Sequence, residues 1–235
     1  MIETNNNLVA IAYKAGFCGS LLYYLLVQSP EVAVYKRAPK LNFRNGTCHE
    51  DTEEWFNNLH DYRDSLVVSE DRWAEYLTEP AKSALASEKL VTFKCHPNIA
   101  YQMTFVRGLR VLYITHSNPL LSERWCYEKL FKPMGEKHYK TVFKKIFKSN
   151  TIPNRINNML KRKFLITNIN HDVRTIEECK KKFNNDLFQV KLEKLLKKDF
   201  EHYSEICNFL NITEMNDSLF YKIIDTYNDS QWKRF

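Results

Sequence analysis

The sequence predicts an α/β fold, with a mainly parallel central sheet flanked by helices on both faces. Short apolar segments alternate along the chain with longer segments of helical periodicity, which is typical of strand–helix–strand units. Two of the five glycines stand three residues apart, between the first apolar segment and the helix that follows it. No internal repeat, low-complexity tract or flexible linker divides the chain. We therefore expect a single domain that spans residues 1–235.

The expected strands are short, apolar or alternating in polarity, and bounded by turn residues. They cover residues 8–13, 90–95, 110–115, 163–167 and 187–192. Pro97 disfavours the α region for His96, so we expect the second of these strands to end in a turn there.

The expected helices begin at acidic residues, at N-cap residues or at prolines suited to a first helical position. They cover residues 20–28, 52–62, 70–77, 80–87, 118–131, 173–184, 199–210 and 218–235, with more helix on both sides of Pro153. The clearest start is Asn118-Pro119, where the asparagine suits the N-cap and the proline the first turn.

The net charge of +7 is concentrated between residues 129 and 163, which hold eleven Lys or Arg residues and one acid, Glu136. The stretch is either a solvated basic face or a surface that attracts an anion. Its interleaved aromatic residues would suit single-stranded nucleic acid. The same spacing suits the buried face of an amphipathic helix, so the pattern disfavours nucleic acid as a partner.

The apolar runs fall far short of the roughly 18–20 residues that span a bilayer, and no basic segment precedes the first of them. The six cysteines are scattered and include no C-x-x-C pair, so we expect reduced thiols in a cytoplasmic protein. We expect no metal site and no membrane span.

The segment "KAGFCGS", Lys14 to Ser20, connects the first expected strand to the first expected helix. Glycines there would let backbone N–H groups converge, and the helix N-terminus adds further donors and a positive dipole end, which together favour a phosphate. Lys14 would neutralise that phosphate and the Ser20 hydroxyl would donate to it. The alternative is a tight turn in which the glycines only permit close packing. The spacing differs from that of a Walker A motif.

A second group of residues is "FKCHPN", in which Lys94 and His96 stand at the carboxyl end of a strand. Open α/β sheets bind ligands at that edge. His96 would take a proton from a substrate hydroxyl near neutral pH. The alternatives are a structural histidine and an exposed strand-end lysine.

Together these segments resemble the sulfotransferase family. "YKAGFCGSLL" is similar to the family's 5′-phosphosulfate-binding loop, with Tyr13 in place of a proline and Phe17-Cys18 as an apparent insertion. "KCHP" resembles the turn that carries the family's catalytic base, and "VLYITHSNPLLSERW" resembles the strand, turn and helix that hold the nucleotide's 3′-phosphate. "FQVKLEKLLKKDFEHYSEICNFLNI" is similar to the family's terminal block. The four blocks keep the family's order and cover most of the chain.

The resemblance implies a P-loop-like sulfotransferase fold and sulfuryl transfer from 3′-phosphoadenosine 5′-phosphosulfate (PAPS) to a hydroxyl, with no metal. His96 would be the base, Lys14 would act at the leaving phosphate and Lys94 would steady the sulfuryl oxygens. The 5′-phosphate would be bound by the loop residues Lys14, Ala15, Gly16, Phe17, Cys18, Gly19 and Ser20. The arginine usual before Asn-Pro is replaced by His116-Ser117, so the candidates for the 3′-phosphate are His116, Ser122 and Arg124.

Two other functions remain open at this level. One is a kinase with a degenerate P-loop, which would require ATP and Mg²⁺. The other is a non-catalytic module of the same fold that binds an anionic polymer. The sequence does not identify the acceptor of a transferase: a sugar hydroxyl, a small alcohol or phenol, and a peptide tyrosine remain open. The basic stretch slightly favours an anionic acceptor such as a polysaccharide, and it would equally suit recruitment of the nucleotide.

Overall fold

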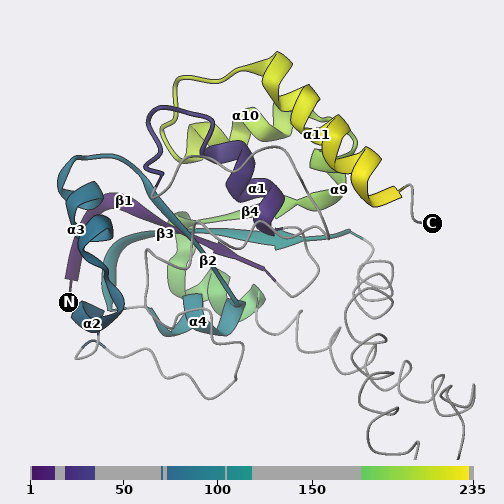
Figure 1. Ribbon diagram of the computed structural model, residues 1–235. Coiled ribbons are helices and arrows are strands. Elements are labelled where there is room, and N and C mark those ends of the chain that lie inside the picture. Colours follow the sequence, from purple (N-terminus) through teal and green to yellow (C-terminus); the bar gives the residue numbers. More distant parts are fainter. Residues whose placement is uncertain are drawn as a thin grey trace, which may run out of the picture.

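The computed structural model describes residues 2–13, 19–34, 70, 73–103, 105–117 and 176–232. Within these residues the four strands are all parallel and form one sheet in the order β2-β1-β3-β4 (Figure 1). The strands are β1 (Ile2–Ala12), β2 (Val91–Cys95), β3 (Val106–Thr115) and β4 (Leu187–Lys191). The prediction of a mainly parallel α/β sheet is confirmed.

The chain reverses its direction of travel across the sheet at β1. It passes from β1 to β2 on one side, returns across β1 to β3 on the other side, and continues outward to β4. The connections that follow β1 and β3 therefore start from neighbouring strands and diverge. In open α/β sheets, ligands bind in the crevice at the carboxyl ends of such strands.

Helices cover both faces of the sheet (Figure 1). On one face α1 (Gly19–Leu26), α10 (Phe200–Phe209) and α11 (Asp217–Trp232) pack around Val9 and Ile11. On the other face α3 (Glu79–Ala86), α4 (Pro97–Gln102) and the helical residues 176–183 pack around Leu8 and Ala10. Because β1 is buried on both faces, residues 8–12 form the continuous apolar run of a central parallel strand.

Several expected boundaries are wrong. Both β1 and β3 begin well before the residues where the apolar pattern starts. The Thr4 hydroxyl donates to the Arg107 carbonyl (3.0 Å), and the pairing register shifts between Glu3 and Leu8. Positive φ angles at Asn5, Asn6 and Gly108 accompany this irregularity. Both strands therefore continue through polar residues on the N-terminal side of a bulge, and the hydrophobic pattern does not predict this extension.

The turn expected at Pro97 is instead the start of α4. His96 has extended backbone angles (φ −74°, ψ 154°) and forms the N-cap, so its conformation satisfies the restriction that proline imposes while the helix begins directly after it. Of the described residues within the expected helix 70–77, only Trp73–Tyr76 are helical, as the short α2. Two short elements after residue 183 were not expected, a 3₁₀ turn (Asn184–Asp186) and α9 (Leu192–Leu196). The elements expected at 52–62, 118–131 and 163–167, and around Pro153, lie outside the described residues.

Candidate functional site

The carboxyl ends of β1 and β2 lie side by side. Ala12 is in register with Cys95, and the Tyr13 amide donates a hydrogen bond to the Cys95 carbonyl (3.1 Å). Cys95 separates Lys94 from His96 in the chain. The first residue after β1 is therefore attached to the segment that carries both side chains.

Lys94 is fully buried beneath α1. It is in register with Ile11, whose side chain belongs to the core on the α1 face, and it has 0% exposed surface. Its Nζ donates a hydrogen bond to the Ser20 hydroxyl (3.3 Å) and lies 5.9 Å from the centre of the Tyr23 ring. The exposed strand-end lysine considered from sequence is ruled out, and the amino group instead lies at the positive end of the α1 dipole.

Gly19 and Ser20 form the first turn of α1 and are both buried. A Cβ added to Gly19 would lie 2.3 Å from two carbons of the Tyr13 ring, Cδ1 and Cε1, and 2.6 Å from its Cζ. Close packing against Tyr13 therefore accounts for glycine at this position. Ser20, by contrast, is held by its contact with Lys94, so the two residues have different structural roles.

His96 directly follows the carboxyl end of β2 and is partly exposed. Its carbonyl accepts hydrogen bonds from the amides of Ile99 (3.0 Å) and Ala100 (3.3 Å), which fix its backbone at the start of α4. Its ring stacks on that of Tyr13, with 6.5 Å between ring centres and 25° between planes. Such a pair at this separation contributes about 0.5 kcal/mol.

A second group of polar residues lies at the carboxyl ends of β3 and β4. The Ser117 amide donates to Glu193 Oε1 (3.1 Å), while the Thr115 hydroxyl donates to the Val190 carbonyl (3.3 Å). Burial acts to raise the pKa of the Glu193 carboxyl, but the hydrogen bonds from Ser117 and the nearby His116 hold that pKa below its ordinary value. Glu193 is therefore a carboxylate at neutral pH, and its Oε2 is buried without a hydrogen-bond partner.

The end of β4 is fixed by His202, a buried side chain of α10. Its Nε2 accepts a hydrogen bond from the Lys191 amide (2.9 Å), so Nδ1 carries the proton that it shares with Glu205 Oε2 (2.9 Å). Lys191 is the N-cap of α9, the helix that carries Glu193 in its first turn. His202 thus fixes the backbone at Lys191, two residues before Glu193, and the Glu193 carboxylate contacts the turn after β3.

Of the residues singled out from sequence, the structure brings Lys94, His96, Gly19 and Ser20 together at the ends of β1 and β2. It places His116 after β3, with β1 between its strand and that of His96. Neighbouring strands are about 4.8 Å apart, so the two backbones are separated by roughly 10 Å. The remaining sequence-predicted residues lie outside the described residues: Lys14, Ala15, Gly16, Phe17, Cys18, Ser122 and Arg124.

Two residues of this edge were not identified as functional from sequence. Tyr13 was noted only as a replacement for a proline, and Glu193 only as part of the strand–helix block near the C-terminus. The signal available for each was its position directly after a strand end. Among the described residues there is no group of three or more His, Cys, Asp or Glu side chains placed to hold a metal ion. None of the helices described is long and apolar enough to cross a membrane.

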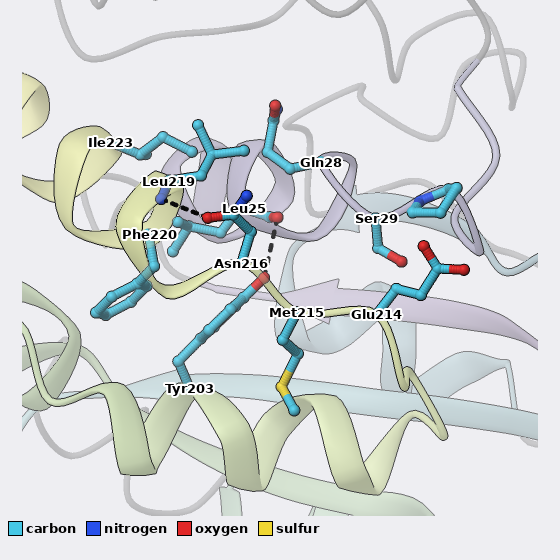
Figure 2. Close-up of a pocket in the computed structure, with 11 residues that line it drawn as sticks. Leu25, Gln28, Ser29, Tyr203, Glu214, Met215, Asn216, Leu219, Phe220 and Ile223 are labelled. Atoms are coloured by element: carbon cyan, nitrogen blue, oxygen red, sulfur yellow. Dashed lines mark hydrogen bonds between the residues drawn. The ribbon is translucent and has the colours of Figure 1, made fainter.

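A pocket of about 270 Å³ lies elsewhere, between the C-terminal end of α1 and the α10–α11 connection (Figure 2). The Tyr203 hydroxyl donates to the Leu25 carbonyl (3.1 Å) at its floor, and the Leu219 amide donates to Asn216 Oδ1 (2.9 Å) at its rim. Lys94 and Ser20 are at the opposite, N-terminal end of α1. The pocket is therefore separate from the edge that holds the predicted site residues.

No protein-family model matches the chain, and no curated protein sequence matches it. Among solved structures, the chain is similar to the crystal structure of a sulfotransferase from Alicyclobacillus acidocaldarius. The identity is 12%, the match covers 95% of this chain and 94% of that one, and the TM-score is 0.49.

Proposed function

We propose that the protein is a sulfotransferase of a P-loop-like fold, in one domain, that binds PAPS at the carboxyl edge of its sheet. It would transfer the sulfuryl group to a hydroxyl of an acceptor, in the cytoplasm and without a metal. One observation carries this proposal: the buried ammonium of Lys94 lies at the first turn of α1, and His96 follows it by two residues at the same edge. The proposed anion site and the proposed base would then be adjacent.

Two positive potentials coincide at this point. The first turn of α1 lies at the positive end of the helix dipole, and the Lys94 amino group donates to the Ser20 hydroxyl of the same turn. Because Lys94 is shielded from water, its charge is screened less than that of a surface lysine. An anionic group in front of Gly19 and Ser20 is favoured by both effects, and a phosphosulfate is such a group.

The reaction would proceed by attack of the acceptor oxygen on sulfur while the bond from sulfur to the bridging phosphate oxygen breaks. The acceptor proton would pass to the imidazole of His96, and the leaving nucleotide would keep the bonding electron pair on its 5′-phosphate. Lys14 and the first turn of α1 would stabilise that developing negative charge. Lys94, on the buried side of α1, would add to the positive electrostatic potential there. A base of this kind contributes about 10²- to 10⁴-fold to the rate.

The 3′-phosphate would lie toward the end of β3. His116, Ser122 and Arg124 are the residues that we propose for it. Glu193 introduces a negative charge close to His116, so affinity for the 3′-phosphate would depend on a balance between the cationic side chains and this carboxylate. The acceptor would approach from the His96 side of the edge, and the basic stretch between residues 129 and 163 favours an anionic saccharide as that acceptor.

The proposal is tested by thermal unfolding with adenosine 3′,5′-bisphosphate, compared with ATP plus Mg²⁺. At 100 times its Kd the bisphosphate should add about 2.7 kcal/mol, which is about 5–10 °C for a chain of this size. Radiolabelled PAPS with a panel of saccharides, phenols, alcohols and tyrosine peptides would then identify the acceptor.

The other two functions give different results in the same experiment. A shift only with ATP and Mg²⁺ would indicate the kinase. Salt-sensitive binding to an anionic polymer, with no shift from either nucleotide at millimolar concentration, would indicate the non-catalytic module. Either result would overturn the sulfotransferase proposal.

A further inference from the structure

Tyr13 lies between two residues of the proposed site and contacts both. One side of its ring fills the space where a Cβ of Gly19 would be, at the first turn of α1. The ring also stacks on His96, with 25° between the two planes. The Tyr13 amide is bonded to the Cys95 carbonyl, so its backbone is attached to the residue that precedes His96. Only 9% of Tyr13 is exposed.

These contacts restrict how the Tyr13 ring can move. A different χ1 rotamer would remove the ring from the space beside Gly19 and from the face of His96 at once. Since α1 and the β-sheet form a packed core around Tyr13, the ring is held as part of that core. The Tyr13 ring therefore restricts the motion of the His96 imidazole on the face that it contacts, although His96 itself is partly exposed.

We propose that Tyr13 is a positioning residue that holds the His96 imidazole in the orientation needed to accept a proton, and that Gly19 is glycine so that Tyr13 can take this place. The proposal rests on the function proposed above for His96. A general base must lie within about 2.6–3.2 Å of the atom that it deprotonates. Orientation of the ring therefore matters more to transfer than to nucleotide binding.

The deciding experiment measures the reactivity of His96 and needs no acceptor. Diethyl pyrocarbonate acylates unprotonated imidazole nitrogens, and peptide mass spectrometry reports each histidine separately. The modification rate of His96 is measured as a function of pH in the wild-type protein and in the variants Tyr13→Leu, Tyr13→Phe and Gly19→Ala. His116 in the same sample is the internal reference, because it lies at another strand end and is also partly exposed.

We expect the His96 rate to rise several-fold in Tyr13→Leu, which removes the stacked ring, and in Gly19→Ala, which displaces it. Tyr13→Phe retains a ring and should restore the wild-type rate and pH profile. The rate at His116 should stay constant throughout. An unchanged His96 rate in Tyr13→Leu would overturn the proposal, and so would equal effects of the leucine and phenylalanine variants. If Gly19→Ala does not fold, the comparison of the His96 rate in Tyr13→Leu with that in Tyr13→Phe still tests the proposal.

A second measurement separates this proposal from the proposed function. Once an acceptor is known, kcat can be measured. Tyr13→Leu should lower kcat by on the order of 10²-fold, because a displacement of the His96 imidazole by about 1 Å has an effect of that size, while the KM for PAPS should change much less. Tyr13→Phe should recover most of kcat. If His96 reactivity responds as expected but the bisphosphate gives no thermal shift, the sulfotransferase function fails while the positioning of His96 by Tyr13 stands.

Discussion

The Nζ of Lys94 lies 3.3 Å from the Ser20 hydroxyl, and the lysine has no exposed surface. The contact joins β2 to the first turn of α1 across 74 residues of sequence. It also places the Lys94 amino group at the positive end of the helix dipole. An anion bound at the first turn of α1 would lie close to both the helix dipole and the Lys94 amino group, so we explain this arrangement by ligand binding.

Replacement of Lys94 by methionine tests that explanation. Met has a similar length and no amino group, so the variant fills the same buried space while it loses the contact with Ser20. The thermal shift caused by adenosine 3′,5′-bisphosphate should largely disappear. Lys82→Met is the matched control, because Lys82 is an exposed lysine on α3 that pairs with Glu79 (2.7 Å), and its ligand shift should match wild type. A fully retained shift in Lys94→Met would show that the ammonium is not part of the anion site.

His96→Ala should lower the rate of sulfuryl transfer by about 10²- to 10⁴-fold, because it removes the proposed base. The bisphosphate should still stabilise the variant, since His96 lies beside the first turn of α1 rather than within it. Between pH 5 and 8, where imidazoles usually titrate, the rise of the wild-type rate with pH should be lost in the variant. The measurement is a pH–rate profile at saturating PAPS. A rate within a few-fold of wild type would assign the proton transfer to another group.

Local sequence signals predicted much of this fold. The strands β2 and β4 and the helices α1, α3 and α10 begin and end within about two residues of their expected limits. Asp199 shows why, since its side chain accepts from the His202 amide (3.0 Å) as the N-cap of α10. Capping and alternation are read from neighbouring residues, whereas the bulged first halves of β1 and β3 depend on pairing across about 100 residues.

The same distinction separates the predicted and unpredicted parts of the site. The position of Lys94 and His96 at a strand end follows from the apolar pattern before them, so it could be predicted. The burial of Lys94 could not, because it depends on where α1 packs. The contacts of Tyr13 with His96 and of Ser117 with Glu193 likewise join segments whose proximity is set by strand order.

Glu31 should make the stability of the protein depend on acid pH. Its carboxylate accepts hydrogen bonds from the amides of Thr213 (2.8 Å) and Glu214 (3.1 Å), which join the end of α1 to the α10–α11 connection. The Glu214 bond is the largest cause of a lowered pKa for Glu31. A depressed folded-state pKa means that this stabilisation is present above the unfolded value, near 4.5, and is lost as pH falls through the lower folded value.

Glu31→Gln should therefore cost about 1 kcal/mol of unfolding free energy at pH 7, a discounted value because these bonds are solvent-exposed. The difference from wild type should shrink toward zero below pH 4. Chemical denaturation at a series of pH values measures it. Glu88→Gln, a change at an exposed carboxylate between α3 and β2, is the control and should show no comparable loss. A Glu31→Gln difference that is constant with pH would contradict the assignment.

Glu193→Gln examines the other end of the proposed nucleotide site. Glutamine keeps an oxygen that can accept from the Ser117 amide, so the turn after β3 should keep its position while the negative charge is removed. If the 3′-phosphate lies near His116, loss of this charge should raise the affinity for adenosine 3′,5′-bisphosphate by several-fold, through roughly 1 kcal/mol of relieved repulsion. Affinity for adenosine 5′-monophosphate, which lacks that phosphate, should stay constant.

The ratio of the two affinities, measured by calorimetry at fixed salt, is the informative quantity in this experiment. Glu193→Ala is the companion variant, because it also removes the acceptor for Ser117 and should release the turn. We expect it to weaken bisphosphate binding relative to Glu193→Gln. If both variants leave the ratio at its wild-type value, the 3′-phosphate is bound away from Glu193, and His116 is not one of its ligands. A raised ratio in Glu193→Gln alone would place the 3′-phosphate at the end of β3, because only there does the lost charge lie close enough to act on it.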